Sequence, residues 1–430
     1  MPEHRAEEDT RVLSITSIAL SFCAGFCALG RRGRRFRYGR LLGGLNAMGI
    51  FHGGIPLNES TLRTAIARLG SALVDQRRAR CIIEPHADSS GYWFGGGNLC
   101  PLPDGGLLLV GRYRNAGDST FGLAKGERGA ELALFRSDDG GASFSKILSF
   151  SKADLAVGGH EVLSIEGAAI AYSSEGFELF VSTEKAGIDY PEGFEAFKKP
   201  GTGLWSIDRM AAADLAALGK AKPEAVELRG DPGRLHLKDP CFFRAGDGST
   251  VLIFCSHPFG WSSSNSAYAI RPAGDKCFGD AVHDFFPRGT AWDVAATRVT
   301  DVLSLPGGLF GETRSVNLVF YDGAECMRRL EESPNAVRRP RGYSCEELAG
   351  LAYFIGDEFS KPIRLSPFEP LFVSPWGTGC SRYIHACADA FGIHAAWQQG
   401  RSSGAQPLVM NSLSWEEVSG ILGQIPREGH

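Results

Sequence analysis

The chain has 430 residues and a formal net charge of −4, with 43% hydrophobic and 22% charged residues. This balance is typical of a soluble globular protein, and it leaves no basic excess for binding nucleic acid. The 55 glycines and 22 prolines predict many turns, and the 27 Phe, 10 Tyr and 7 Trp favour strands. Together they predict an all-β fold.

The N-terminal segment joins an apolar stretch at 12–30 to a basic stretch, RRGRRFRYGR, at 31–40. A signal peptide carries its positive charge before the apolar core, so this order argues against one. As a membrane span the apolar stretch is short, and it includes three serines and a threonine. We therefore treat residues 1–70 as a poorly ordered extension or a weak membrane anchor. Contact with a membrane is expected only if 12–30 acts as that anchor.

Five similar units follow, each with a strongly apolar second strand between Gly-rich turns. These second strands are expected at 106–115, 177–185, 251–257, 316–326 and 391–400. Four-stranded units of about 70 residues predict a five-bladed β-propeller. We place it at 71–420, with the segment near 72–84 closing the last blade and 421–430 as a C-terminal tail. A six-bladed, sialidase-like propeller is the alternative.

One hairpin carries a recognisable motif, SDDGGASF at 137–144. It fits the Asp-box pattern Ser-x-Asp-x-Gly-x-Ser/Thr-Trp/Phe, which marks propeller hairpins in sialidases and in other proteins. Asp139 is expected to cap the turn through its side chain, and the glycines accept positive φ. The motif predicts a turn and says little about chemistry.

The eleven cysteines include no CxxC pair and no zinc-ligand spacing. Several, such as Cys255, lie inside apolar runs. We interpret them as unpaired, which slightly favours a cytoplasmic location; nothing else in the sequence indicates the compartment.

Polar residues recur where first strands begin and second strands end, and in a propeller these points meet at one mouth of the central channel. The first-strand residues at matched positions are Asn98, Glu166, Asp239, Asp293 and Arg382. The second-strand ends supply Arg112, Arg114, Glu184, Lys185, His257, Asp322, Glu325 and Gln398. Aromatic residues near the same strand ends include Trp93 and Trp261.

Carboxylates that face each other across a polar pocket can cleave glycosidic bonds, one as the acid and one as the base or nucleophile. We therefore expect catalysis by Asp239, Glu166 and Asp293, with Glu325 as a further candidate for the proton donor. The residues expected to bind substrate are Arg112, Arg114, Arg382, Arg298, His257, Trp93, Trp261, Asp322 and Gln398.

This arrangement resembles the five-bladed β-propeller glycoside hydrolases, which include arabinanases, xylosidases, invertases and levansucrases. The resemblance implies an acid at the start of the first strand in each of the first three blades. The middle acid often lies in an Asp-Pro step, which KDP at 238–240 resembles, and Glu325 resembles the Glu of the Glu-Cys step of invertases. Blade 1 departs from the pattern, because it offers Asn98 unless Asp88 or Asp104 reaches in. The triad is then shifted by one blade.

A second resemblance, to sialidases, rests on the Asp box. It implies an arginine triad that grips a carboxylate, for which Arg112, Arg298 and Arg382 are candidates, and a Tyr–Glu nucleophile pair, for which Tyr321 and Glu325 are candidates.

The leading hypothesis is thus a glycoside hydrolase with a carbohydrate substrate. The alternatives are a sialidase-like hydrolase of acidic sugars, a non-catalytic propeller that binds carbohydrate or protein, and a lyase with His257 or His160 as its base. No cofactor is expected, although oxygen ligands from several blades leave a structural Ca²⁺ open.

Overall fold

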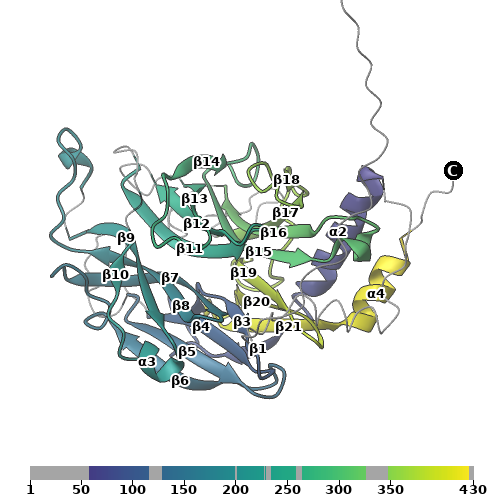
Figure 1. Ribbon diagram of the computed structural model, residues 1–430, viewed down its shortest axis with the longest axis horizontal. Coiled ribbons are helices and arrows are strands. Elements are labelled where there is room, and N and C mark those ends of the chain that lie inside the picture. Colours follow the sequence, from purple (N-terminus) through teal and green to yellow (C-terminus); the bar gives the residue numbers. More distant parts are fainter. Residues whose placement is uncertain are drawn as a thin grey trace, which may run out of the picture.

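The computed structural model describes residues 58–115, 128–198, 201–226, 228, 234–257, 264–325 and 347–425. Within these residues the strands form five antiparallel sheets, four with their strands in sequence order and a fifth in which β1 joins β19, β20 and β21 (Figure 1). The prediction of a five-bladed β-propeller is confirmed, and the six-bladed alternative is wrong.

Each blade runs from an inner strand at the channel to an outer strand at the rim. Blade 1 contains β2 (Trp93–Gly95), β3 (Leu99–Pro101), β4 (Leu107–Arg114), β5 (Glu131–Ser137) and β6 (Ser145–Ser151). Blade 2 contains β7 (Val162–Ser173), β8 (Gly176–Lys185), β9 (Leu204–Ala212) and β10 (Glu224–Ala225). Blade 3 contains β11 (His236–Arg244), β12 (Thr250–His257), β13 (Asn265–Arg271) and β14 (Val282–Phe286). Blade 4 contains β15 (Ala296–Leu305), β16 (Val316–Ala324), β17 (Leu348–Ile355) and β18 (Ile363–Arg364).

Blade 5 is built from both ends of the described chain. It contains β19 (Ser381–Ala388), β20 (Gly392–Gln399) and β21 (Leu408–Ser414), and its outer strand is β1 (Arg80–Ile83). β1 pairs antiparallel with β21, so the prediction that the segment near 72–84 closes the last blade is confirmed. This pairing ties the first strand of the chain to the last one.

The second strands are buried along their whole length in blades 2 to 5, because neighbouring blades cover both faces of each sheet. This explains their apolar sequences, of which TVLIFCSH in β12 is an example. Polar side chains therefore gather at the strand ends.

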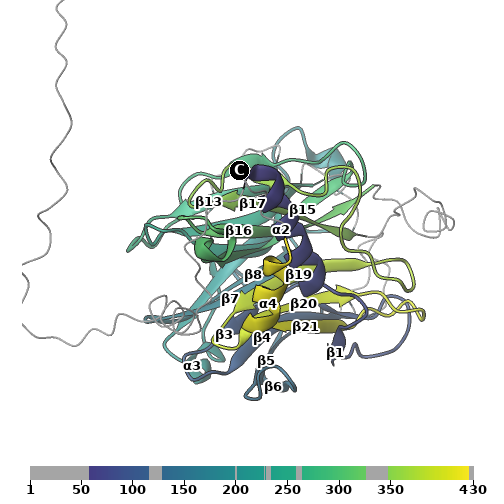
Figure 2. The ribbon, with the colours of Figure 1, turned by 90° about the vertical axis from the view of Figure 1, so that its right-hand side faces the viewer.

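Two helices flank blades 4 and 5. α2 (Glu59–Leu73) begins after Asn58, whose Oδ1 accepts a hydrogen bond from the backbone N–H of Thr61 at 2.8 Å. α2 and α4 (Trp415–Gly423) lie side by side on the outside of the propeller (Figures 1 and 2). The buried face of α2 packs into the same apolar cluster as blades 4 and 5, through Leu62, Ile66, Leu69 and Leu73.

The expected domain boundaries therefore need correction. A domain that starts at residue 71 would lose α2, whose leucines and isoleucine repeat at helical spacing and cover the propeller. At the other end, α4 continues to Gly423 and Ile425 is buried in the same cluster, so the fold extends into the expected tail. The apolar stretch 12–30 lies outside the described residues. Among the residues that are described, no helix is both long and apolar enough to span a membrane.

Smaller elements fill the connections between strands. α3 (Leu215–Leu218) follows β9, and two short 3₁₀ helices span Glu195–Phe197 and Gly307–Phe310. In the turn between β5 and β6, Asp139 accepts hydrogen bonds from the Ser143 backbone N–H at 2.9 Å and from the Ser143 hydroxyl at 2.6 Å. These hydrogen bonds form the expected turn cap, but they do not show that the protein is related to sialidases.

Candidate active site

In every blade, the hydrogen-bonded pairing between the inner strand and the second strand is interrupted. In blade 1 the break separates β2 from β3, and in the other blades the pairing shifts between Ile165 and Ala168, Lys238 and Cys241, Val299 and Asp301, and Arg382 and His385. Residues at the five breaks line one pocket at the channel: Gly96, Gly97, Gly167, Asp239, Thr300 and Tyr383. The break, rather than the start of the strand, is what turns a residue of each blade toward the pocket.

The Lys-Asp-Pro step explains the break that holds Asp239. Pro240 has no N–H to donate to the ladder, and Asp239 has a φ of 54°. Blade 2 has a glycine, Gly167, next to the Asp239 carboxylate. Any other residue would clash there, because its Cβ would lie 2.6 Å from Asp239 Oδ1. Instead the Gly167 N–H donates to that oxygen at 3.0 Å. Tyr383, at the break of blade 5, also has positive φ, at 50°. Such strained residues persist where their surroundings hold them, and they cluster at functional sites.

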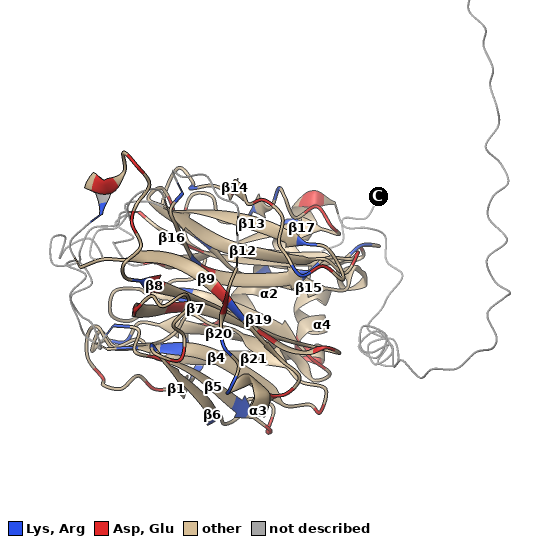
Figure 3. Ribbon diagram, turned by 60° about the vertical axis from the view of Figure 1, so that its left-hand side comes forward, with Lys and Arg blue, Asp and Glu red and all other residues tan. Residues whose placement is uncertain are grey.

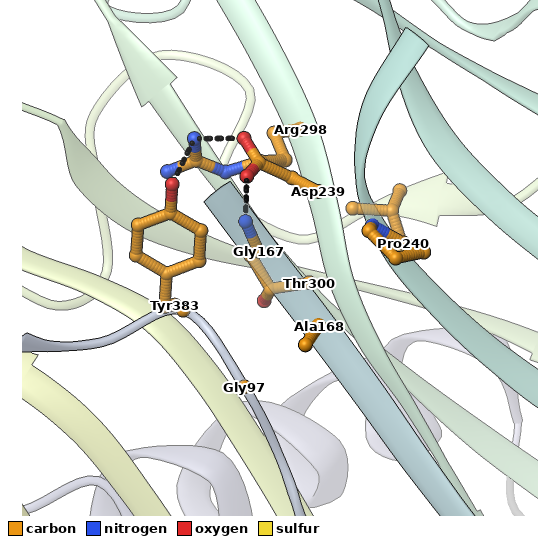
Figure 4. Close-up of a pocket in the computed structure, with 10 residues that line it drawn as sticks. Gly97, Gly167, Ala168, Asp239, Pro240, Arg298, Thr300 and Tyr383 are labelled. Carbon is orange, nitrogen blue, oxygen red and sulfur yellow. Dashed lines mark hydrogen bonds and ion pairs between the residues drawn. The ribbon is translucent and has the colours of Figure 1, made fainter. Parts of the chain in front are cut away.

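Arg298 on β15 connects these two strained residues (Figure 4). Its Nη1 donates to Asp239 Oδ2 and to the Tyr383 hydroxyl, both at 2.9 Å, and its guanidinium carbon lies 3.7 Å from the centre of the Tyr383 ring. Nη1 also lies 3.1 Å from Glu347 Oε1. Nη2 donates to Asp322 Oδ2 at 2.6 Å. One buried arginine thus joins acids from blade 3 and blade 4 and a tyrosine from blade 5.

The acids around Arg298 have different pKa values. Burial by itself would raise the pKa of Asp239, but the charges of Arg298, Lys238 and Arg112 outweigh it and lower that pKa to about 2. Burial raises the pKa of Asp322 to about 6, because Arg298 offsets the desolvation only in part. The cluster therefore holds one carboxylate that stays ionised and one that can carry a proton at mildly acidic pH.

Glu166 extends the cluster into blade 2. It accepts a hydrogen bond from the Ser164 hydroxyl at 2.8 Å and from Arg112 Nη2 at 3.4 Å. Its burial favours the neutral form, yet the positive charges of Lys238 and Arg112 lower its pKa to about 2. Arg112 also donates to the Tyr383 hydroxyl at 3.3 Å, so Glu166 and Asp239 belong to the same group of charges.

Trp93 on β2 forms the aromatic side of the site. The guanidinium of Arg382 lies 3.7 Å from its ring centre and that of Arg114 lies 5.1 Å away. Arg382 is paired with Glu347 and donates to Gln406, which accepts a hydrogen bond from Gln398. Figure 3 shows that charges of both signs lie on strands in the middle of the molecule as well as on its rim.

The structure thus brings together most of the residues that the sequence predicted for the site: Asp239, Glu166, Arg112, Arg114, Arg298, Arg382, Asp322, Trp93 and Gln398. Asp293 is not among them. It lies before β15, next to Trp292, and the charged atom nearest to it is Arg364 Nε at 3.3 Å. In the sequence, Asp293 is matched with Asp239 as a first-strand residue. In β15, however, the pairing shifts later, at Thr300, and Thr300 is the residue that lines the pocket.

Other expected residues lie elsewhere or outside the described ranges. Glu325 is exposed beyond the end of β16, and Trp261 lies outside the described residues. His257 is buried at the end of β12, opposite His236. In blade 1, Asn98 donates to the backbone carbonyl of Ile170. Asp88 and Asp104 do not replace it, because they hydrogen-bond to Ser403 and Arg136 in exposed positions.

The residues expected for a sialidase-like site are arranged differently. Arg112, Arg298 and Arg382 do converge, but each is already paired with an acid of the chain itself. Tyr321 donates to the backbone carbonyl of Ser366 at 3.2 Å and packs against Trp292. It precedes Asp322 on β16 and therefore points to the opposite face of the strand from the cluster.

Sequence reasoning missed Tyr383, Glu347 and Lys238. Lys238 was visible beside Asp239 in the Lys-Asp-Pro step, and Tyr383 is adjacent to Arg382. No pattern marks Glu347, which comes to the site through its bonds to two arginines from other strands. Among the residues that the structure describes, no group of three His, Cys, Asp or Glu side chains is arranged to hold a metal ion, so no Ca²⁺ position is assigned.

Comparisons with known proteins give a likeness to solved structures only. No family model matches the chain, and no curated protein matches it. An α-L-arabinanase from Penicillium chrysogenum, complexed with arabinobiose, is 11% identical over 79% of this chain and 98% of its own, with a TM-score of 0.45. An α-L-arabinofuranosidase from Lactobacillus brevis is 8% identical over 81% and 94%, with a TM-score of 0.48.

A GH43_1 enzyme from Xanthomonas citri, complexed with xylotriose, is 9% identical over 82% of this chain and 93% of its own, with a TM-score of 0.47. At these identities and TM-scores the likeness carries no argument about activity. The residues of the channel pocket alone must therefore decide what chemistry the protein can perform.

Proposed function

We propose that this protein is a glycoside hydrolase that works at the channel pocket. One observation carries the proposal: Arg298 binds two buried carboxylates whose pKa values lie far apart, about 2 for Asp239 and about 6 for Asp322. Glycoside cleavage needs this division, because one group must protonate the leaving oxygen while another acts as an ionised base or nucleophile.

Asp239 is the carboxylate that lines the pocket, and we assign it the role of base or nucleophile. Asp322 is the candidate proton donor, since its pKa is close to the pH at which an acid catalyst works best. Arg298 lines the pocket and is hydrogen-bonded to Asp322, which does not line it, so proton donation by Asp322 requires the sugar to displace this arginine. Glu166, whose pKa is lowered to about 2, adds a further negative charge to the cluster and favours the cationic sugar of the transition state.

The test is a panel of p-nitrophenyl α- and β-glycosides of pentoses and hexoses, assayed from pH 4 to 8. We expect release of p-nitrophenol from at least one glycoside, with activity falling above about pH 6 as Asp322 loses its proton. The Asp322→Asn variant should lose most activity and also this pH dependence. A protein that hydrolyses none of these glycosides, nor the matching disaccharides, would favour the non-catalytic binding propeller.

A hydrolase of acidic sugars is a second candidate, and Arg114 favours it. This side chain is partly buried over Trp93, and among the described residues it forms no ion pair with an acid. Burial lowers the pKa of Arg114 to about 10; the charge of Glu166 opposes this shift, and those of Arg128 and Arg112 add to it. A sugar carboxylate beside the pocket would relieve this repulsion, and arginine binds carboxylates through two parallel hydrogen bonds.

p-Nitrophenyl glucuronides and sialosides decide between neutral and acidic substrates. If the sugar is acidic, Arg114→Gln should raise KM for these compounds at least tenfold with a smaller effect on kcat, because the lost contact binds the ground state and the transition state alike. If the substrate is neutral, the variant should match the wild type on the preferred glycoside.

A further inference from the structure

A second hollow, distinct from the channel pocket, lies on blade 5. It has a volume of about 320 Å³, within the range of small-molecule sites in proteins. It is formed by β1, the ends of β20 and β21, and the loop that precedes β19, with Trp376, Cys81, Asp88, Arg401, Ser402 and Pro407 among its lining residues. None of the chemistry described so far uses it.

Trp376 provides an aromatic surface in this hollow, and 43% of the residue is exposed. Its loop is closed by hydrogen bonds: the Ser374 N–H donates to Gly379 O at 2.9 Å, and the Ser374 hydroxyl donates to Gly400 O at 3.0 Å. Gly377 has a φ of 59°, and a Cβ there would lie 2.2 Å from Arg401 O. The backbone of this loop is therefore fixed against the turn between β20 and β21.

Polar groups border the aromatic surface. Arg401 forms two parallel hydrogen bonds with Glu84, at 2.7 and 2.8 Å, which fix its guanidinium. Asp88 is exposed, and its Oδ1 accepts a hydrogen bond from the Ser403 hydroxyl at 2.7 Å and lies 3.7 Å from Arg401 Nη1. The floor includes Ala79, Pro407 and Val409. An apolar floor with an exposed ring and a border of hydroxyl, carboxylate and guanidinium groups suits a ligand with one apolar face and many hydroxyls.

Strand β20 contributes to the hollow and to the channel cluster, which share no lining residue. Gln399 lines the hollow, and the preceding residue, Gln398, belongs to the channel cluster through Gln406 and Arg382. Successive residues of a strand point to opposite sides, so β20 presents one glutamine to each site. The hollow and the channel cluster therefore lie on opposite sides of β20, so a ligand can bind in the hollow without entering the channel pocket.

We propose that the hollow around Trp376 is an accessory binding subsite for a neutral oligosaccharide chain, with one sugar ring stacked on the indole. The link to catalysis rests on the proposed function, whereas binding itself does not depend on it. A peptide is the other kind of ligand that an aromatic hollow accepts, and the experiment below separates the two.

The test is affinity electrophoresis of the full chain in native gels that contain soluble xylan, arabinan, starch or galactan. We expect at least one polysaccharide to retard the wild type, and Trp376→Ala to weaken that retardation at least tenfold in apparent Kd. Trp376→Phe, which keeps a smaller ring, should retain part of it. Phe391→Ala is the matched control, because Phe391 is another exposed aromatic, at 69%, outside the hollow; it should bind like the wild type.

The outcomes separate this proposal from the proposed function. Activity on small p-nitrophenyl glycosides, measured on the same variants, should be unchanged by Trp376→Ala. If these glycosides are hydrolysed but no polysaccharide is retarded through Trp376, the subsite is refuted and the hydrolase stands. If retardation through Trp376 occurs without any hydrolysis, the hydrolase is refuted and the subsite stands. Release of the retarded protein by unrelated peptides but not by oligosaccharides would overturn the sugar assignment.

Discussion

Asp239 and Asp293 are two buried acids with opposite environments. Each has one arginine close to its carboxylate, Arg298 at 2.9 Å and Arg364 at 3.3 Å. Asp239 is surrounded by further positive charge, so its pKa is lowered to about 2. Burial raises the pKa of Asp293, and Arg364 offsets this only in part. The comparison teaches that burial alone does not decide the charge of an acid; the number of cations around it does.

Asp239 also differs from Asp293 in what it faces. Asp239 lines the channel pocket at the break in β11. Asp293 is enclosed by its own neighbours, since a Cβ on Gly289 would lie 1.9 Å from its Oδ1 and one on Gly323 would lie 2.5 Å from its Cβ. The first acid is placed to meet a ligand, whereas the second is paired with Arg364 on β18 of blade 4.

The largest expected effect is on catalysis. Asp239→Asn preserves the shape of the side chain but removes its charge, and loss of a general acid or base costs about 10²–10⁴-fold in kcat. Asp293→Asn should leave kcat within about threefold of the wild type, since Asp293 is not among the residues that line the channel pocket. Both are measured on the best glycoside of the panel, with circular dichroism as a check of folding. Equal losses in the two variants would contradict the assignment of Asp239 to the active site.

The next effect is on stability. Arg298→Met should lower the free energy of unfolding by about 3–5 kcal/mol, because it leaves Asp239 and Asp322 buried without their shared cation. Arg364→Met should cost less than about 2 kcal/mol, because Asp293 can remain neutral when its partner is removed. Urea denaturation of the two variants measures the difference. A smaller loss for Arg298→Met than for Arg364→Met would show that the Arg298 cluster adds little to folding.

The smallest effect is in the dependence of stability on pH. The pKa of Asp239 is lower in the folded chain than in the unfolded one, so its contribution is present above about pH 4 and is lost as the pH falls toward 2. Between pH 5 and pH 2 the wild type should therefore lose about 2 kcal/mol more than Asp239→Asn.

Asp293 should show the opposite sign. Its pKa is raised by folding, so ionisation costs stability as the pH rises above the unfolded value, and Asp293→Asn should gain relative to the wild type in that direction. Melting temperatures from pH 2 to 7 for the wild type and both variants test the pair. Parallel curves for the two variants would contradict the difference in environment.

The repeat of apolar second strands was enough to predict five blades and the closure of the last one. Each such strand must be buried on both faces, and only stacked sheets provide that. Helix α2 was missed because it begins inside the stretch 1–70, which the misplaced basic charge at 31–40 set apart from the expected fold. The apolar face of α2 packs on residues of blades 4 and 5, and this contact exists only in the assembled propeller.

The sequence by itself determined that acids and arginines would meet at the channel, because alternation along a strand and the order of blades fix which strand ends come together. The Lys-Asp-Pro step marked Asp239 in the same way, since proline cannot pair in the ladder. Only the tertiary structure decided which of these residues touch. Arg298 reaches Asp239 on blade 3, Tyr383 on blade 5, and Asp322 and Glu347 of its own blade, and the pKa of each acid depends on that shared contact. Charge interactions act through space over a few ångströms, so the position of a residue in the chain does not reveal the partner that sets its chemistry.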